Sequence, residues 1–381
     1  MVLALTLLLL GAPPPEFEEL PKPWVKGANY DQRMLLHLEA RFTLVRDVPA
    51  YRIKGLATYD RAAMSDQLLL GDLLFHAPKL LGPRAAAFGI SCASCHPAGA
   101  AHNTFFVNRA SDRPGNVDLL WDYFYDEADD GIYAPRNISS LRGCASSPPY
   151  RRDGSVATLS ETNALVVHLE FQQQVPKPWL DALDVFVESL ELHPSPFLDG
   201  EGRLTEKASA KVKAGEAVFD APREAFEGKS CASCHDKKHG FSDHQLHPLW
   251  HGTSKDTLGV TERFDTPVLL NMIETAPYFF DGSAPSLPAA VVQLDKRHGL
   301  KLSAAERDAL TAYLEAVGAV ETRRQNWSPQ ERVRLALAWG RLAEGADEKL
   351  WPVVLDTMRM HLRLAARDGS GPAAAEWGRL W

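Results

Sequence analysis

The chain has 381 residues, of which 45% are hydrophobic and 24% are charged, and its formal net charge at pH 7 is −8. This length corresponds to about two domains of ordinary size, and the apolar content is sufficient for buried cores. The negative charge is spread along the sequence without a basic run, which argues against a nucleic acid as a partner.

The N-terminus has the pattern of an export signal. Residues 2–10 are apolar, Gly11 and Ala12 follow, and three prolines at residues 13–15 break the run. This length is typical of the hydrophobic region of a signal peptide and is too short for a membrane span. A basic region before it is missing, as expected if the signal begins upstream of Met1, and an ordinary buried segment is the alternative. We expect a signal peptide at residues 1–12, an exported, periplasmic protein and no transmembrane span.

The hexapeptide SCASCH occurs at residues 91–96 and again at residues 230–235. Within it, Cys-x-x-Cys-His is the attachment signature of a c-type haem, in which two thiols add to the haem vinyl groups and the His binds the iron. Zinc is the competing ligand of such cysteine pairs, but the His directly after each pair favours haem. The fifth cysteine, Cys144, is left over and is expected to be a small buried apolar residue. We therefore predict two haem c groups, one held by Cys92, Cys95 and His96 and the other by Cys231, Cys234 and His235.

Helical patterns follow each motif. In residues 178–191 apolar side chains recur at helical spacing, and the same holds for residues 304–317, which open with a capping box at Ser303 and Glu306. The Pro- and Gly-rich stretch 193–202 between them indicates a boundary. The tail adds two further helices, one beginning after a capping box at residues 328–331 and one over about residues 348–367, without a counterpart earlier in the chain.

The two motifs lie in two similar parts of the chain. Residues 149–155 and 277–283 share the pattern Pro-Tyr-x-x-Asp-Gly-Ser, and other pairs of segments recur in the same order. Such a repeat indicates a duplication within the chain. The other pairs are 71–78 with 215–222, 166–170 with 291–295, and 181–183 with 308–310.

Four further segments accompany the haem motifs: Leu70-Gly71-x-x-Leu74-Phe75, Arg136-Asn137-x-x-Ser140-Leu141, Thr266-Pro267-x-Leu269-x-Asn271 and Thr275-Ala276-Pro277-Tyr278-Phe279-x-Asp281-Gly282. With these segments, residues 66–318 resemble the bacterial diheme cytochrome c peroxidase superfamily, which includes the MauG-type enzymes. The resemblance implies two cytochrome c-like domains that face each other, with the haem of the first domain usually peroxidatic and the other passing electrons to it. It also implies a calcium ion between the domains, with the backbone at Thr266 among its ligands.

The expected fold is mainly α, with two cytochrome c-like domains in tandem, each with one covalently bound haem c, plus a C-terminal helical extension. That extension packs either on a domain or on a second copy of the chain, in which case the protein is a homodimer. The expected boundaries are 1–12 for the signal peptide, 13–65 for an N-terminal segment that packs on the domains, 66–200 for domain 1 with haem 1, 201–320 for domain 2 with haem 2, and 321–381 for the extension.

Three positions depart from the family pattern. The Trp between the haems of family members is replaced by Arg152, and a distal Gln is replaced by Thr162. The sixth ligand of haem 2, a Met or Tyr in the family, falls at Leu294, which cannot bind iron. His298 and Met272 are the remaining candidates for that ligand.

One catalytic position of the family is retained. Its distal Glu matches Glu170, and a carboxylate there would move a proton between the two peroxide oxygens and assist cleavage of their bond. Glu170 pairs with Asp295 in the internal repeat, so we expect the functions of the two haems to differ at these positions. His168 is an alternative residue facing haem 1, and a solvated glutamate at a helix end is the alternative interpretation of Glu170.

We expect an oxidoreductase that reduces hydrogen peroxide with electrons from a small donor protein, a cytochrome c or a cupredoxin. Haem 2 is expected to receive the electrons, and haem 1 is expected to be the reaction site. Two alternatives stay open: oxidation of aromatic residues on a partner protein, as in MauG-type enzymes, and a non-catalytic diheme electron carrier with both irons six-coordinate.

Overall fold

The computed structural model describes residues 65–369, apart from residues 83–84, 87–88, 108–109, 119–132, 153, 172–174, 191, 193–194, 248–253, 257–258, 262, 321–327 and 346–347. The expected signal peptide and most of the expected N-terminal segment, residues 1–64, lie outside this part. The described fold is mainly α-helical with three two-stranded sheets, which confirms the prediction of a mainly α fold. Within the same residues, no helix has the length and apolar character needed to cross a membrane.

The first half of the described chain, up to the end of α7, contains four α-helices, short 3-10 turns, irregular segments and one small sheet. Strands β1 and β2 pair antiparallel, with Asn116 opposite Asn137. The elements are α3 (Asp66–His76), η3 (Pro78–Leu80), α5 (Cys92–Cys95), η4 (Pro97–Gly99), β1 (Asn116–Val117), β2 (Arg136–Asn137), η5 (Cys144–Ser146), α6 (Leu159–Phe171) and α7 (Lys177–Glu188).

The second half, from α8 to α10, repeats this plan. Strands β3 and β6 pair antiparallel with Leu246 opposite Asp265, and β4 pairs with β5. The elements are α8 (Ala210–Asp220), η6 (Glu224–Phe226), η7 (Cys231–Ser233), η8 (Lys237–His239), β3 (Leu246–His247), β4 (Ser254–Asp256), β5 (Gly259–Thr261), β6 (Phe264–Asp265), η9 (Met272–Glu274), α9 (Leu287–His298) and α10 (Ala304–Gly318). The capping box predicted at Ser303 and Glu306 is present at the start of α10.

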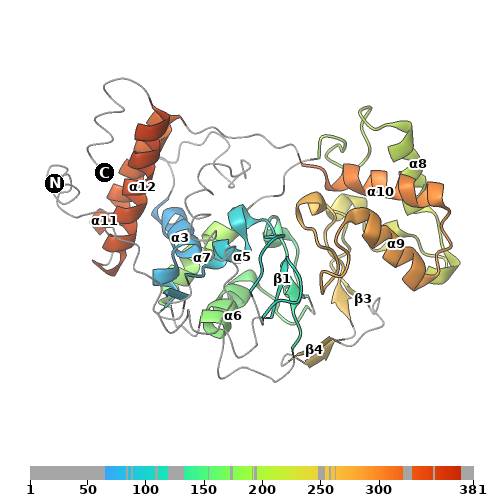
Figure 1. The fold of residues 1–381 in the computed structure, drawn as a ribbon, viewed down its shortest axis with the longest axis horizontal. Helices are drawn as coiled ribbons and strands as arrows, with labels where there is room; N and C mark the ends of the chain where they lie inside the picture. Colours follow the sequence, from blue (N-terminus) through green and yellow to red (C-terminus); the bar gives the residue numbers. More distant parts are fainter. Residues whose placement is uncertain are drawn as a thin grey trace.

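One helix crossing organises each half. Helix α3 lies across α7, and α8 lies across α10 (Figure 1). A Cβ atom added to Gly71 would lie 2.0 Å from the carbonyl oxygen of Ala182, and one added to Gly215 would lie 1.9 Å from that of Ala309. Because only glycine permits so close a contact, the repeated glycine marks the same crossing in both halves.

The tail packs on the first half. Helices α11 (Pro329–Gly345) and α12 (Trp351–Asp368) form a hairpin beside α3 (Figure 1). Trp339 of α11, only 2% exposed, belongs to the same apolar core as Phe75 of α3 and Phe186 of α7. A separate core in the second half contains Phe219 and Tyr313.

Candidate haem sites

Both hexapeptides begin with the same local structure. In each, the N–H of the first serine donates to the hydroxyl of the serine three residues later, from Ser91 to Ser94 and from Ser230 to Ser233, both at 3.0 Å. This reciprocal capping starts a short helical turn in both copies, α5 and η7. The turn fixes the spacing of the two thiols and of the histidine that ends it.

The His235 imidazole has the environment of an iron ligand. Its Nδ1 lies 2.8 Å from the carbonyl oxygen of Phe241, so this nitrogen carries the proton and Nε2 keeps its lone pair. Burial lowers the pKa of His235, opposed by the carbonyl of Phe241. The ring is therefore neutral at pH 7, as an iron ligand must be.

His96 differs from His235 in its hydrogen bonding. Burial lowers the pKa of His96 to about 4, with the Ser139 carbonyl acting in the opposite direction. Its buried Nδ1 makes no hydrogen bond of good geometry to any described residue, so the carbonyl of Ser139 is close but poorly aligned. In the second half, the carbonyl of Pro267 raises the pKa of His235. Pro267 is the equivalent of Ser139, 128 residues further along the chain.

The thiols fit haem better than zinc. Burial raises the pKa of both Cys231 and Cys234, as expected for thiols not poised as metal-bound thiolates. Among the described residues, the cluster with metal-ligand spacing contains Cys234, Asp243 and His247 and leaves Cys231 out. A zinc site built on Cys-x-x-Cys uses both cysteines, so this cluster does not match one.

The Tyr313 hydroxyl also lies near the second attachment motif. Its hydroxyl is buried without a hydrogen-bond partner among the described residues, which is rare for a buried polar atom. Burial raises its pKa, and the Cys231 thiol adds to that shift, so the hydroxyl lies near the attachment site. The equivalent residue in the first half is Phe186, which has no hydroxyl to satisfy.

The predicted distal residues lie on or near helix α6. His168 is exposed on this helix, and Glu170 lies in its last turn with a side chain outside the described part of the structure. The roles of both stay predictions. Thr162, at the position of the family's distal Gln, donates its hydroxyl to the Thr158 carbonyl, which is an ordinary helix contact.

Asp295 has a structural role that the sequence did not indicate. One carboxylate oxygen accepts the Leu302 N–H at 3.0 Å, and the other pairs with Arg307 at 2.8 Å. The hydrogen bond from Leu302 is the main cause of its lowered pKa. Asp295 thus fastens the loop after α9, and the expected difference between the two haems at Glu170 and Asp295 stays a prediction.

The sixth-ligand candidates of haem 2 occupy different places. Met272 is buried against Gly318, where an added Cβ would lie 2.6 Å from its Cγ. His298 ends α9, with its ring 5.3 Å from that of Phe226. Leu294, one helical turn before His298, is half-buried. The assignment of this ligand stays a prediction.

The calcium assignment also stays a prediction. The carbonyl oxygen of Thr266, its expected ligand, accepts the hydroxyl of Ser242 at 2.7 Å, and the residue itself is buried. A carbonyl oxygen has a second lone pair, so this contact leaves room for a cation.

The halves meet through reciprocal hydrogen bonds. The Asn137 N–H donates to the Phe280 carbonyl at 2.8 Å, and the Asp265 N–H donates to the Arg152 carbonyl at 2.9 Å. Donors and acceptors are each 128 residues apart, so the contacts are equivalent under a local two-fold relation. An ion pair between Arg142 and Glu274, 2.6 Å long, also joins the halves. The sequence showed no sign of these contacts beyond the repeat itself.

Comparison with known proteins finds a family match in the second half of the chain. Residues 209–331 match the sequence model of the family described as di-haem cytochrome c peroxidase. The resemblance to the di-haem cytochrome c peroxidases is confirmed. Because this family is di-haem, it implies two haem c groups, and the two attachment motifs and their buried, neutral histidines fit them.

One curated relative in sequence is hydrazine synthase subunit gamma from Kuenenia stuttgartiensis. It is 26% identical over 245 residues, which are 52% of this chain and 62% of the relative, so the chain spans less than two thirds of that protein.

Two solved structures are similar at low levels. One is hydrazine synthase from Kuenenia stuttgartiensis pressurised with xenon, with 21% identity, a TM-score of 0.48, and coverage of 66% of this chain and 88% of the other. The other is a MauG-like protein associated with microbial copper homeostasis, with 18% identity, a TM-score of 0.47, and coverage of 71% and 93%.

Proposed function

We propose that the protein is an exported, periplasmic oxidoreductase that reduces hydrogen peroxide with electrons from a small redox protein, a cytochrome c or a cupredoxin. The observation that carries the proposal is the pair of attachment motifs, each ending in a buried, neutral histidine, in a chain with a di-haem peroxidase match. Haem iron supplies the one-electron chemistry and the place where peroxide binds.

Glu170 is the proposed proton carrier in the first half. Reduction of one hydrogen peroxide consumes two electrons and two protons and releases two water molecules. The Glu170 carboxylate would accept a proton from one peroxide oxygen and return it to the other oxygen, which would then leave as water. The position of Glu170 on α6, between the first motif and α7, supports this role.

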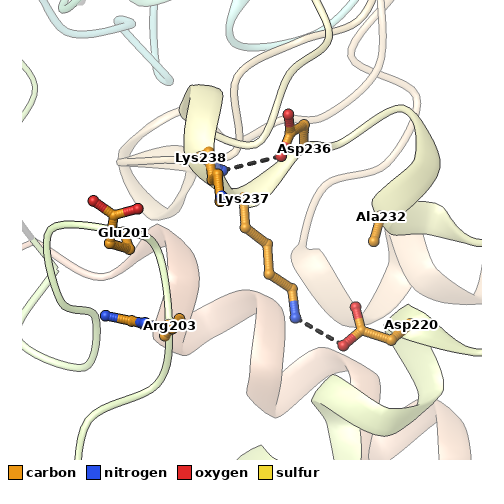
Figure 2. Close-up of a pocket in the computed structure, with 7 residues that line it drawn as sticks. All are labelled: Glu201, Arg203, Asp220, Ala232, Asp236, Lys237 and Lys238. Atoms are coloured by element: carbon orange, nitrogen blue, oxygen red, sulfur yellow. Dashed lines mark hydrogen bonds and ion pairs between the residues drawn. The ribbon is translucent and has the colours of Figure 1, made fainter.

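The second half is the proposed place of electron uptake. A cavity of about 390 Å³ lies beside the second motif, and Figure 2 shows the residues that line it. Ala232, which stands between the two thiols, forms part of its wall, so a donor seated there approaches the attachment edge of haem 2. Lys237 is paired with Glu216 at 2.9 Å and with Asp220 at 2.7 Å, whereas Lys238 is exposed.

The test uses two glutamates of the same helix. Glu170→Gln removes the proton carrier, so peroxide turnover should fall about 100-fold or more while both haems stay attached. Glu161→Gln is the matched control, because Glu161 lies in the first turn of α6 and accepts the Thr158 hydroxyl at 2.9 Å, a contact that an amide oxygen retains. Equal turnover of Glu170→Gln and wild type would refute the role of Glu170.

Spectra separate the proposal from its two alternatives. A long-lived spectral change after peroxide is added to the fully oxidised protein would indicate a MauG-type oxidation of aromatic residues on a partner. A wholly low-spin spectrum that responds to neither peroxide nor cyanide would indicate a non-catalytic electron carrier.

A further inference from the structure

Arg152 lies at the junction between the two haem-binding halves. Its carbonyl accepts the Asp265 N–H, and its guanidinium Nη2 donates to the Asn137 carbonyl. Asn137 is two residues before Ser139, whose carbonyl raises the pKa of His96. Asp265 is two residues before Pro267, whose carbonyl raises the pKa of His235. Arg152 therefore connects the two segments that reach the two iron-ligand histidines.

The Arg152 charge is poorly compensated. Burial lowers the pKa of Arg152 to about 10, the nearby charge of Arg136 acts in the same direction, and Asp281 acts against them. Asp281 accepts the Ser283 N–H, and within the described part of the chain Arg152 forms no ion pair. A partly buried cation without an ion-pair partner is costly, so such a residue normally pairs with an anion.

The second half shows that the junction does not need arginine. Phe264 and Phe280 stand at the positions equivalent to Arg136 and Arg152, and their rings stack with centroids 5.3 Å apart. Arg136 lies over the face of Phe280, with 5.6 Å between its guanidinium carbon and the ring centroid. In the second half, an apolar pair therefore fills the positions that Arg136 and Arg152 occupy in the first half. Packing at the junction does not by itself explain why the first half has a guanidinium at Arg152.

We propose that Arg152 binds a carboxylate at the junction between the two halves. A guanidinium presents planar, paired N–H donors that match a carboxylate, and one of its nitrogens is already fixed by Asn137. The carboxylate has two possible sources, a haem propionate or a small free carboxylate. The proposal requires the haems and does not depend on peroxide turnover, so each of the two proposals can fail alone.

The test measures the midpoint potentials of the two haems by spectroelectrochemistry. A positive charge near a haem favours the reduced iron, so Arg152→Gln should lower one midpoint potential. We expect the ratio of reduced to oxidised haem at a fixed ambient potential to fall about tenfold, or ~59 mV for a one-electron couple. Arg263→Gln is the control, because Arg263 is an exposed arginine that donates to the Leu246 carbonyl at 3.1 Å in the same region. It should leave both potentials unchanged.

Buffer composition separates the two sources. If the carboxylate is a propionate, the effect of Arg152→Gln is the same with and without acetate. If it is a free carboxylate, acetate shifts the potential of the wild type and leaves that of the variant unchanged. Equal potentials of variant and wild type in both buffers, with both haems attached, would overturn the proposal.

A second variant covers the case in which Arg152→Gln loses haem. Arg152→Lys keeps the charge but not the paired donors, so its affected potential should lie below that of the wild type. A lysine variant with wild-type potentials in both buffers would also overturn the proposal.

Discussion

Gly71 and Gly215 mark the points where two helices cross in the two halves of the chain. An alanine at either position would place its Cβ about 2 Å from a backbone carbonyl oxygen, of Ala182 or of Ala309, which cannot move aside as a side chain can. We expect each Gly→Ala substitution to lower the free energy of unfolding by ~1–3 kcal/mol or more. Urea unfolding followed by circular dichroism measures this. Gly200→Ala is the control, because nothing lies within 4 Å of a Cβ there, and an equal loss in the control would contradict the crossing argument.

Asp265 makes the stability of the junction depend on pH. Burial raises the pKa of Asp265 from 3.8 to about 6, and its buried Oδ1 has no hydrogen-bond partner among the described residues. The folded protein therefore holds this proton more tightly than the unfolded chain, and the stability it contributes is lost as the pH rises from about 4 to about 6.

Asp265→Asn copies the other half, where Asn137 donates to the carbonyls of Pro277 at 2.6 Å and of Phe279 at 3.1 Å. The variant has no proton to lose, so its advantage over the wild type in free energy of unfolding should grow through that pH window. Urea unfolding at a series of pH values measures the difference between the two proteins. A difference that stays constant with pH would be inconsistent with the raised pKa.

At the scale of elements, the helices were predictable because their signals are local. Apolar spacing over residues 178–191 and 304–317 corresponds to α7 and α10, and the box at Ser303 and Glu306 starts α10 as predicted. The two-residue strands β2 and β6 are too short for any periodic signal. They form by pairing with β1 and with β3, which lie earlier in the chain, so the information that places them is not local.

The hairpin of α11 and α12 packs on the first half and is the element that distinguishes it most clearly from the second half. Trp339 is buried in the core shared with α3, so Trp339→Ala should lower the free energy of unfolding by ~3–5 kcal/mol. Leu337→Ala on the same helix is the control, since Leu337 is 55% exposed and should change stability little. Thermal unfolding of the haem-loaded variants compares them. Similar losses for both would show that α11 does not pack on the first half as described.

At the scale of the whole molecule, the two halves share the same order of helices and sheet but differ at the positions that face each other. The shared order was predictable from the repeated segments, and the two haem attachment sites were predictable from the Cys-x-x-Cys-His spacing. The exchange of hydrogen bonds between Asn137, Asp265, Arg152 and Phe280 depends on how the halves dock, which no single segment encodes. The contacts of Asp295 were not predictable for a similar reason, because its partners Leu302 and Arg307 lie beyond the segment that the repeat compares.

The central claim is that the two haems together reduce peroxide, each giving one electron. The most direct measurement is a titration of the fully reduced protein with hydrogen peroxide, followed by haem absorbance. Because one peroxide takes up two electrons on its way to water, a single equivalent should oxidise both haems of one chain. Haem absorbance that stays in the reduced form after excess peroxide would contradict the claim and indicate an electron carrier instead.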